Sequence, residues 1–436
     1  MGMSARTSQN LKPILLTAGI TLALWIGSKW YCQDWFANPY KYVAKFGSLT
    51  ATTLMCWSIL LSSRWRFLEV YFGGLDTAYQ IHKRIGRWAF FLILLHPVFL
   101  AVDRLPDVVA FLRAMWFLRP EGDTYLWGQN VGVITLLLFA GLIAATLWIK
   151  IPYHIWKRTH EWFGLVLLLI IVHILLVSAD VAAYPLLTVW VYGLLTLAAA
   201  GFIYIRFLYW YLGPRFPHAV SSIEKTEDII KATFAPLERK MDFRPSQFVY
   251  LVVHKEGISP EPHPYSIASG YNLAAEFKLG IKKLGDHTRT LDRLDKGDHV
   301  TVYGPYGRFS DKFLRAERDC VFVAGGIGVT AFIGMWHVAV HSEDLREPEE
   351  VPEPLGHLHP EIIKNWKSPL VSLFYAVATA EEASFDSDIR QEVASSHSQG
   401  FEAFEQRGHH YELYLSDPQG NITAEYLEQH VAGGAR

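Results

Sequence analysis

Four histidines lie in or beside long apolar stretches of the sequence, where an ionisable side chain is costly and is functional by default. His82 and His96 are 14 residues apart, and His160 and His173 are 13 apart. At ~1.5 Å of rise per residue, each pair spans roughly 20 Å of helix. Since imidazole is a common axial ligand of haem iron, two such helices running in the same direction could hold two haems. His82 would then pair with His160, and His96 with His173.

A single histidine in such a stretch is equally well explained as a helix-end residue or a buried hydrogen-bonded group. Two matched pairs favour the metal-binding interpretation. At ~100° per residue, 14 residues return to within ~40° of the same helix face, whereas 13 leave the pair ~140° apart. The second helix is therefore expected to twist, to bulge or to present its histidines to differently placed haems, and Gly164 is the candidate position for a distortion.

The cysteines and the charge exclude several other classes of protein. Cys32, Cys56 and Cys320 are too far apart in sequence to form a metal-binding or disulfide motif, so iron–sulfur clusters are excluded. No C-x-x-C-H motif is present, so any haem would be held without a covalent bond, as in b-type cytochromes. The formal net charge of -2 gives no reason to expect a nucleic-acid partner.

The two histidine pairs resemble the ferric reductase transmembrane domain that NADPH oxidases and cell-surface ferric reductases share. The resemblance implies an oxidoreductase that moves electrons from cytosolic NAD(P)H, through FAD and two b-type haems, to an acceptor outside the cell. That acceptor would be oxygen, giving superoxide, or a ferric chelate. Leu100 stands one helical turn beyond His96, where oxygen-reducing relatives can place a polar residue, and this leans slightly away from a dedicated oxidase. Arg104 could attract an anionic chelate, although an arginine at a membrane edge is more often an interfacial anchor.

A second motif, HPYSIAS, begins at His263 and resembles the flavin-binding motif of the ferredoxin–NADP reductase superfamily. On this resemblance, the ring of Tyr265 offers a face to the isoalloxazine and the hydroxyl of Ser266 bonds the flavin near N5, where hydride arrives. Both residues are therefore candidate catalytic residues. His263 and Pro264 would lie near the pyrophosphate. Alone, the motif could equally be a strand end followed by a proline turn.

Three further segments complete this resemblance. The first, GIKKLGDHTRTL, resembles the pyrophosphate-binding strand and helix start of the superfamily, with Thr288 at the position of a helix cap. The second is a GPYG turn that would join two domains. The third is VFVAGGIGVTAF, a glycine-rich turn between a strand and a helix that would bind the NADPH or NADH pyrophosphate. The candidate cofactor-binding residues in these segments are Ile281, Lys282, Gly285, Thr288, Gly304, Gly307, Gly325, Gly326, Gly328, Val329 and Thr330.

The chain departs from the pattern of these relatives at two places. Ala378–Glu382 contains no arginine for a 2′-phosphate, so the choice between NADPH and NADH stays open. Relatives also continue into a last strand, a Cys-Gly-Pro turn and a helix, so the resemblance predicts that the nucleotide domain here lacks its C-terminal segment, with hydride transfer impaired.

Six apolar segments are long enough to cross a ~30 Å hydrocarbon core and place these histidines in a lipid bilayer. They are predicted near residues 11–28, 43–63, 83–102, 130–149, 160–178 and 184–210. With a cytoplasmic N-terminus, the inner connections hold twelve Lys and Arg residues and the outer ones hold six. The positive-inside rule therefore predicts a multi-pass plasma-membrane protein with both termini in the cytoplasm.

The remainder of the sequence changes from long apolar runs to short alternating ones. Segments such as FVYLVVH and HVTVY, separated by Pro, Gly and charged turns, predict an antiparallel β-barrel. A strand–turn–helix pattern follows and predicts an α/β nucleotide-binding domain. The expected domains are a transmembrane haem domain at 1–215, an FAD-binding barrel at 216–310 and an NAD(P)H-binding α/β domain at 311–436. Ser342–Glu361, which is acidic and proline-rich, is predicted to be a mobile surface insertion.

Two other classes of protein remain as alternatives. The first is a haem-containing membrane electron carrier whose soluble half docks a partner and does not itself oxidise NAD(P)H. The second is a transporter, which six spans alone would fit and which would contain no haem.

Overall fold

The computed structural model describes residues 11–33, 35, 39–116, 118, 122–177, 179–270, 276–315, 318–341, 368–395 and 408–431. The chain divides into two compact units, Met1–Trp210 and Tyr211–Arg436. The predicted insertion at Ser342–Glu361 lies outside the described residues.

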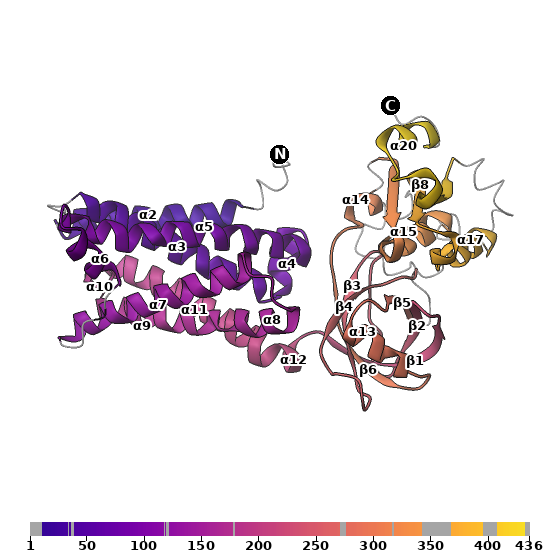
Figure 1. Cartoon of the computed structure of the whole chain (residues 1–436), viewed down its shortest axis with the longest axis horizontal. Helices are drawn as coiled ribbons and strands as arrows, with labels where there is room; N and C mark the ends of the chain where they lie inside the picture. The colour runs from indigo at the N-terminus through magenta and orange to yellow at the C-terminus, as the bar shows by residue number, and fades with distance from the viewer. Residues whose placement is uncertain are drawn as a thin grey trace. The chain divides into compact units, whose positions relative to one another are not determined.

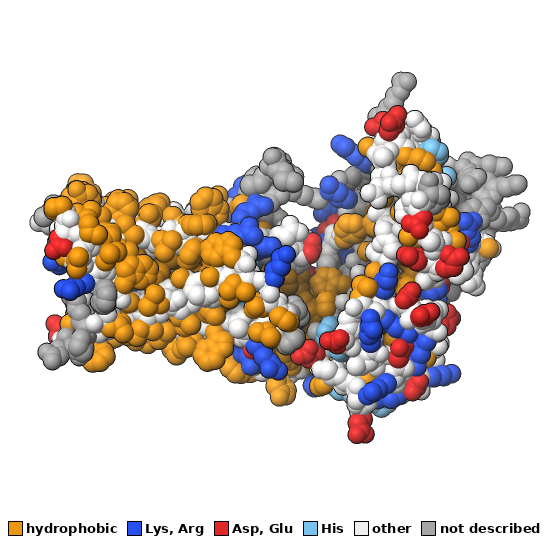
Figure 2. All heavy atoms as spheres, viewed as in Figure 1, with side chains coloured by type: hydrophobic (Ala, Val, Ile, Leu, Met, Phe, Trp, Pro, Cys, Tyr) orange, Lys and Arg blue, Asp and Glu red, His pale blue; other side chains and the backbone are white. Residues whose placement is uncertain are grey.

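The first unit is helical, and six of its helical segments are long and apolar enough to cross a membrane. Figure 1 shows the long helices lying side by side. The segments are α2 (Lys12–Tyr31), α3 (Tyr40–Ser62), α5 (Leu75–Ala101), α7 (Thr124–Leu147), α8 with α9 (Tyr153–Glu161 and Phe163–Val177), and α11 (Pro185–Ile203), which continues through a π-helix at Tyr204–Leu208 into α12 (Tyr209–Leu212). Shorter helices are α4 (Arg66–Phe72), α6 (Val108–Trp116) and α10 (Ala179–Ala183). On the face that Figure 2 shows, hydrophobic side chains predominate between the two ends of this unit, as lipid contact requires.

The predicted six-helix bundle is confirmed, but the start of the third span was predicted eight residues too late. Helix α5 begins at Leu75, directly after Gly73 and Gly74, whose φ angles are +85° and +115°. These glycines end α4 and turn the chain, because a side chain is rarely tolerated at positive φ. His82 therefore lies two turns inside the helix and not at its end.

The helix with the 13-residue histidine spacing is interrupted at Trp162, between α8 and α9. Two consecutive i→i+3 hydrogen bonds occur there, from Trp162 N–H to Thr159 O at 3.1 Å and from Leu165 N–H to Trp162 O at 2.9 Å. Such bonds wind the chain with ~3.0 residues per turn instead of 3.6. The expected distortion is therefore present, two residues before Gly164. Gly164 itself lies against the ring of Phe202 in α11, where a Cβ atom would collide.

The second unit begins with a six-stranded antiparallel sheet in the order β4-β3-β6-β1-β2-β5. The strands are β1 (Arg215–Lys225), β2 (Ile229–Pro236), β3 (Phe248–Val253), β4 (His263–Ser266), β5 (Phe277–Lys282) and β6 (His299–Tyr306). An isolated bridge between Ile267 and Leu279 joins the two edge strands, so the sheet is a nearly closed barrel around a buried apolar core. A short helix, α13 (Asp286–Thr290), follows β5. The predicted barrel is confirmed.

The α/β part of this unit is a parallel sheet in the order β7-β8-β9. Its strands are β7 (Cys320–Gly325), β8 (Val371–Val377) and β9 (His410–Leu415). Helix α15 (Thr330–Val340) follows β7 and helix α17 (Asp386–Ser395) follows β8, and short helices α14 (Asp311–Leu314), α19 (Ser416–Gln419) and α20 (Ala424–His430) complete it. The predicted α/β architecture is confirmed.

Candidate functional site

The structure brings the four membrane histidines together as two facing pairs. The ring centres of His82 and His160 are 6.0 Å apart, and those of His96 and His173 are 6.4 Å apart. A metal ion ~2 Å from one nitrogen of each imidazole, with that nitrogen ~1 Å from its ring centre, would separate two ring centres by about 6 Å. Both pairs therefore have the spacing that a bis-imidazole metal centre needs.

Backbone carbonyls of neighbouring helices orient three of the four rings. Nδ1 of His82 lies 2.8 Å from Ser58 O, Nδ1 of His96 lies 3.2 Å from Ala44 O, and Nδ1 of His173 lies 2.8 Å from Gly128 O. A carbonyl can only accept, so each Nδ1 carries the proton and donates it. Each Nε2 then keeps its lone pair, which is the arrangement of a metal-binding histidine.

Helix α3 supplies the acceptors for the two histidines of α5, and α7 supplies the acceptor for His173 of α9. Small residues allow these helix pairs to approach. Gly128 and Gly132 form a G-x-x-x-G motif on α7, and a Cβ atom on Gly132 would lie 2.6 Å from Cε1 of His173. A Cβ atom on Gly47 of α3 would lie 2.9 Å from Cβ of Leu95 in α5.

His160 is held differently from the other three. Its Nδ1 is buried and has no hydrogen-bond partner among the residues that the structure describes. The ring instead stacks on Trp156, with ring centres 5.0 Å apart, and contacts Phe163 at 4.9 Å. Aromatic packing therefore fixes the orientation of this ring.

Together these four imidazoles fit two haems. The donor set is four neutral imidazoles in two pairs, the pair spacing suits iron ligation, and the surrounding side chains are mostly apolar. The same arrangement gives no support for ions that prefer oxygen ligands, such as Mg²⁺.

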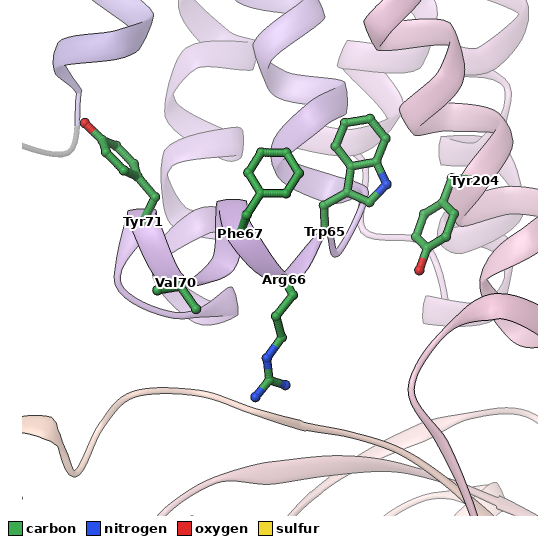
Figure 3. A pocket seen from close by; sticks show the side chains of 6 residues that line it. All are labelled: Trp65, Arg66, Phe67, Val70, Tyr71 and Tyr204. Atoms are coloured by element: carbon green, nitrogen blue, oxygen red, sulfur yellow. The ribbon is translucent and has the colours of Figure 1, made fainter. Parts of the chain in front are cut away.

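A shallow hollow of about 810 Å³ lies at the end of the helical unit that contains α4. Figure 3 shows its lining of Trp65, Arg66, Phe67, Val70, Tyr71 and Tyr204. None of the four histidines lines it. Its exposed aromatic residues are typical of a membrane–water interface, so we interpret it as interfacial anchoring.

In the second unit, the structure brings together two of the predicted flavin-binding segments. The ring of His263 on β4 stacks on that of His287 in α13, with ring centres 3.6 Å apart and planes 9° from parallel. Gly285 is the N-cap of α13, and its N–H donates to Oγ1 of Thr288 at 3.0 Å. The sequence suggested that Thr288 lies at the position of the cap; in the structure Thr288 is instead the third helical residue.

Two buried polar atoms in these two segments have no hydrogen-bond partner among the described residues: the hydroxyl of Tyr265 and Nδ1 of His287. Burial raises the pKa of the Tyr265 hydroxyl, so it is a donor at neutral pH. Burial, together with the neighbouring His263, lowers the pKa of His287 to about 4, against a smaller opposing effect of Glu261. Partnerless buried polar groups in these segments fit a polar ligand such as a flavin.

The other predicted segments occupy distinct positions. Ile281 is in the barrel core, so only its backbone is available to a ligand, whereas Lys282 is half-buried. Gly304 and Gly307 have φ angles of +138° and +103°, which explains the glycines of the GPYG turn. Pro264 is exposed, and Ser266 is half-buried.

The glycine-rich turn after β7 faces open space. Among the described residues, no atom lies within 4 Å of the position that a Cβ atom would take on Gly325, Gly326 or Gly328, and Gly326 has a φ of +51°. The side chains of Val329 and Thr330 are buried, so these two residues offer mainly their backbone. The turn opens α15, an 11-residue helix whose N-terminus favours an anion. The absence of side chains therefore fits the close approach of a phosphate.

The helical unit contains a segment that matches a known protein family. Residues 47–171 match the family described as "Ferric reductase like transmembrane component". This unit carries a ferric reductase-like transmembrane component. The recognition of this component from the histidine pairs is confirmed, and the chain is a multi-pass membrane protein.

Curated relatives match a shorter part of the chain. The probable electron transfer subunit of dihydroorotate dehydrogenase B from Pyrococcus abyssi is 34% identical over 108 residues, 24% of this chain and 38% of that protein. The sulfhydrogenase 1 gamma subunit of Pyrococcus furiosus is 34% identical over 111 residues, 25% of this chain and 37% of that protein. This chain thus spans less than half the length of either relative.

Among solved structures, the flavohaem-like FAD/NAD binding domain of nitric oxide dioxygenase from Vibrio cholerae is 19% identical, with a TM-score of 0.35, over 48% of this chain and 80% of that one. A similarity at this level carries no conclusion about function.

The sequence alone missed the residues that orient the imidazoles. Ala44, Ser58 and Gly128 act through backbone carbonyls, which no side-chain pattern reveals. The G-x-x-x-G motif on α7 is a signal in the sequence that could have indicated a close helix contact beside His173.

Proposed function

We propose that the chain is a transmembrane oxidoreductase that carries electrons from NAD(P)H, through FAD and two b-type haems, to an acceptor on the opposite face of the membrane. The observation that carries this proposal is the two facing imidazole pairs. Three of the four histidines lie within the residues that match the ferric reductase-like component, 47–171, and His173 lies two residues beyond them. His82 with His160 would hold one haem, and His96 with His173 the other.

A haem with two imidazole ligands supplies a one-electron carrier. The chain's own contribution is to orient and protect these ligands. The carbonyls of Ser58, Ala44 and Gly128 hold three rings by their Nδ1 protons, and the apolar helix faces exclude water. Ionised side chains are costly in such a setting, and the neutral imidazoles avoid this cost.

Bound FAD converts a two-electron hydride donor into one-electron steps. His263, Pro264, Tyr265 and Ser266 would bind and orient it, with the Ser266 hydroxyl near the atom that receives hydride. Gly325, Gly326 and Gly328 would admit the pyrophosphate of NADPH or NADH against the N-terminus of α15. The printed name of the Pyrococcus abyssi relative, an electron transfer subunit, supports an electron-transfer role for the matched segment.

The acceptor in this proposal is oxygen or a ferric chelate outside the cell. With both termini in the cytoplasm, electrons move outward, and an inside-negative potential favours this by ~2.3 kcal/mol per electron per 100 mV. Leu100, beyond His96, offers no hydrogen bond to a bound oxygen, which leans toward the ferric chelate. Superoxide formation that superoxide dismutase suppresses would instead identify oxygen.

The proposal is tested by an anaerobic visible spectrum of the detergent-purified chain with added FAD. NADPH, then NADH, then dithionite is added while the low-spin b-haem bands are followed, and haem is counted per chain. Reduction by a nicotinamide cofactor and two haems per chain are expected. A protein that binds no haem would refute the proposal and revive the transporter interpretation.

A second candidate function is an electron carrier whose soluble half receives electrons from a docked partner. Among the described residues β7 is an edge strand, and its Val321 and Val323 are exposed. Exposed apolar side chains on an open edge suit a protein partner. In the spectral experiment, this function predicts haem reduction by dithionite but not by NADPH or NADH.

A further inference from the structure

Three potential metal ligands converge in the α/β part of the second unit, outside the sites described above. His337 and His341 are one turn apart near the end of α15, and Glu392 lies on α17. Nδ1 of His337 is 2.8 Å from Oε2 of Glu392, and Nε2 of His341 is 3.1 Å from the same oxygen. All three ligand atoms lie within 4.8 Å of one another. Among the described residues, this is the only such cluster.

The chemistry of the cluster matches a particular class of metal ion. An H-x-x-x-H pair puts two imidazoles on one helix face, and a carboxylate from a facing helix completes a His₂Glu set. Tetrahedral zinc sites use ligand–metal distances of ~2.0–2.2 Å, which place the ligand atoms themselves ~3.3 Å apart. The two observed separations from Glu392 are already close to this value. Two imidazoles disfavour Mg²⁺ and Ca²⁺, which prefer oxygen ligands.

The cluster is held in place by contacts that do not involve the ligand atoms. Trp336 is fully buried and its indole N–H donates to Ile389 O at 3.4 Å, which joins α15 to α17 beside the cluster. The ring of His337 lies against the backbone of Gly270, where a Cβ atom would collide with it. The C-terminal end of α15 also carries the partial negative charge that favours a cation. The ligands are therefore positioned in advance of binding.

We propose that His337, His341 and Glu392 bind one divalent transition-metal ion of the zinc class. Such an ion links α15, the helix that the glycine-rich turn opens, to α17. It therefore stabilises the α/β fold, by an amount that rises with the logarithm of the free metal concentration once this exceeds the Kd. The alternative is that the three side chains form only a hydrogen-bonded clamp between the helices, and this alternative predicts no bound metal.

The test uses the full-length chain in detergent, freed of metal with a chelator and then dialysed against buffered Zn²⁺. Zinc per chain is measured by inductively coupled plasma mass spectrometry, which separates it from haem iron. The wild type is expected to hold one more zinc than the His337→Gln/His341→Gln variant. The control is His410→Gln, which removes a half-buried imidazole that also faces a glutamate, Glu412, at 3.4 Å. This control is expected to keep the wild-type zinc content.

Thermal unfolding keeps the test decisive if the double variant folds poorly. The single variant Glu392→Gln retains both imidazoles and the helix packing, and Zn²⁺ is expected to raise the unfolding temperature of the wild type and the control but not of this variant. Equal zinc content in the wild type and in the two cluster variants would overturn the proposal. So would a wild type whose unfolding temperature does not respond to Zn²⁺.

Discussion

A single added methyl group at Gly132 tests the structure of the proposed outer haem site. A Cβ atom at this position would lie 2.6 Å from Cε1 and 2.7 Å from Nδ1 of His173. Ordinary contact begins at 3.4 Å, so the ring would have to move by about 0.8 Å, which is 3.4 minus 2.6. That movement strains the 2.8 Å hydrogen bond from Nδ1 to Gly128 O.

The expected cost follows from three contributions. Overpacking in a close-packed interior costs ~1–3 kcal/mol, and the strained hydrogen bond contributes ~1 kcal/mol. Against this, replacing Gly by Ala in a helix stabilises the helix by up to ~1 kcal/mol. The correctly placed His173 should therefore be destabilised by ~1–3 kcal/mol. Haem affinity at this pair should fall roughly 5- to 150-fold, since 1.4 kcal/mol is a factor of ten.

The matched control is Gly141→Ala, on the same helix, because no atom of the described part of the chain lies within 4 Å of a Cβ at Gly141. Haem per chain is measured by the pyridine haemochromogen method on monodisperse protein, with haem titrated into the apoprotein to obtain affinities. Gly132→Ala should weaken one of two haems, whereas Gly141→Ala should keep both. Two tightly bound haems with an unaltered spectrum in Gly132→Ala would refute the assignment of His173 as a ligand.

Three further predictions follow from individual contacts. Ser58→Ala removes a hydroxyl 2.9 Å from Nδ1 of His82 but keeps the backbone acceptor. Haem content should therefore be unchanged. The lost hydrogen bond is worth ~1 kcal/mol, which at 59 mV per factor of ten corresponds to ~40 mV, so potentiometry should find one haem midpoint potential raised by at most ~40 mV. Loss of haem would contradict this prediction. His287 has its pKa lowered from 6.5 to about 4 by burial first and by His263 second, so the folded state favours neutral His287. As the pH is lowered from 6.5 to 4, the free energy of unfolding of the flavin-free chain, measured by urea titration, should therefore fall, and it should fall less in His287→Gln. An equal fall in both proteins would contradict the assigned pKa shift. Finally, a membrane-impermeant maleimide on intact cells should label the exposed Cys32 and leave Cys320 unlabelled until the cells are permeabilised, and the opposite pattern would reverse the predicted topology.

The sequence predicted the six spans because each is a long apolar run, but it placed their ends less well. The first turns of α5 carry four charged residues, Asp76, Lys83, Arg84 and Arg87. Their low hydropathy predicts a loop. The helix nevertheless begins at Leu75, because backbone conformation at Gly74 decides its start. Helix ends are set by local backbone geometry, which hydropathy does not measure.

The residues of the candidate site also fall into a group that the sequence predicted and a group that it did not. Side-chain types and spacing were sufficient to pair His82 with His160 and His96 with His173. They were not sufficient to find the acceptors of the Nδ1 protons, since any residue can offer a carbonyl. Likewise, the His337–His341–Glu392 cluster needs the packing of α15 on α17, although the H-x-x-x-H spacing was visible in the sequence.

The break at Trp162 bears on the unequal spacings of the two histidine pairs. A regular helix would turn His160 and His173 ~140° apart, and both could not then face the histidines of one straight partner helix. Each residue wound at ~120° instead of ~100° adds ~20° of rotation, so the two i→i+3 hydrogen bonds at Trp162 change the angle in the direction that reduces the mismatch. Beside this break, His160 has no carbonyl acceptor among the residues that the structure describes, and Trp156 and Phe163 orient its ring. The aromatic packing around His160 is therefore the physical counterpart of the 13-residue spacing, and the two features have to change together.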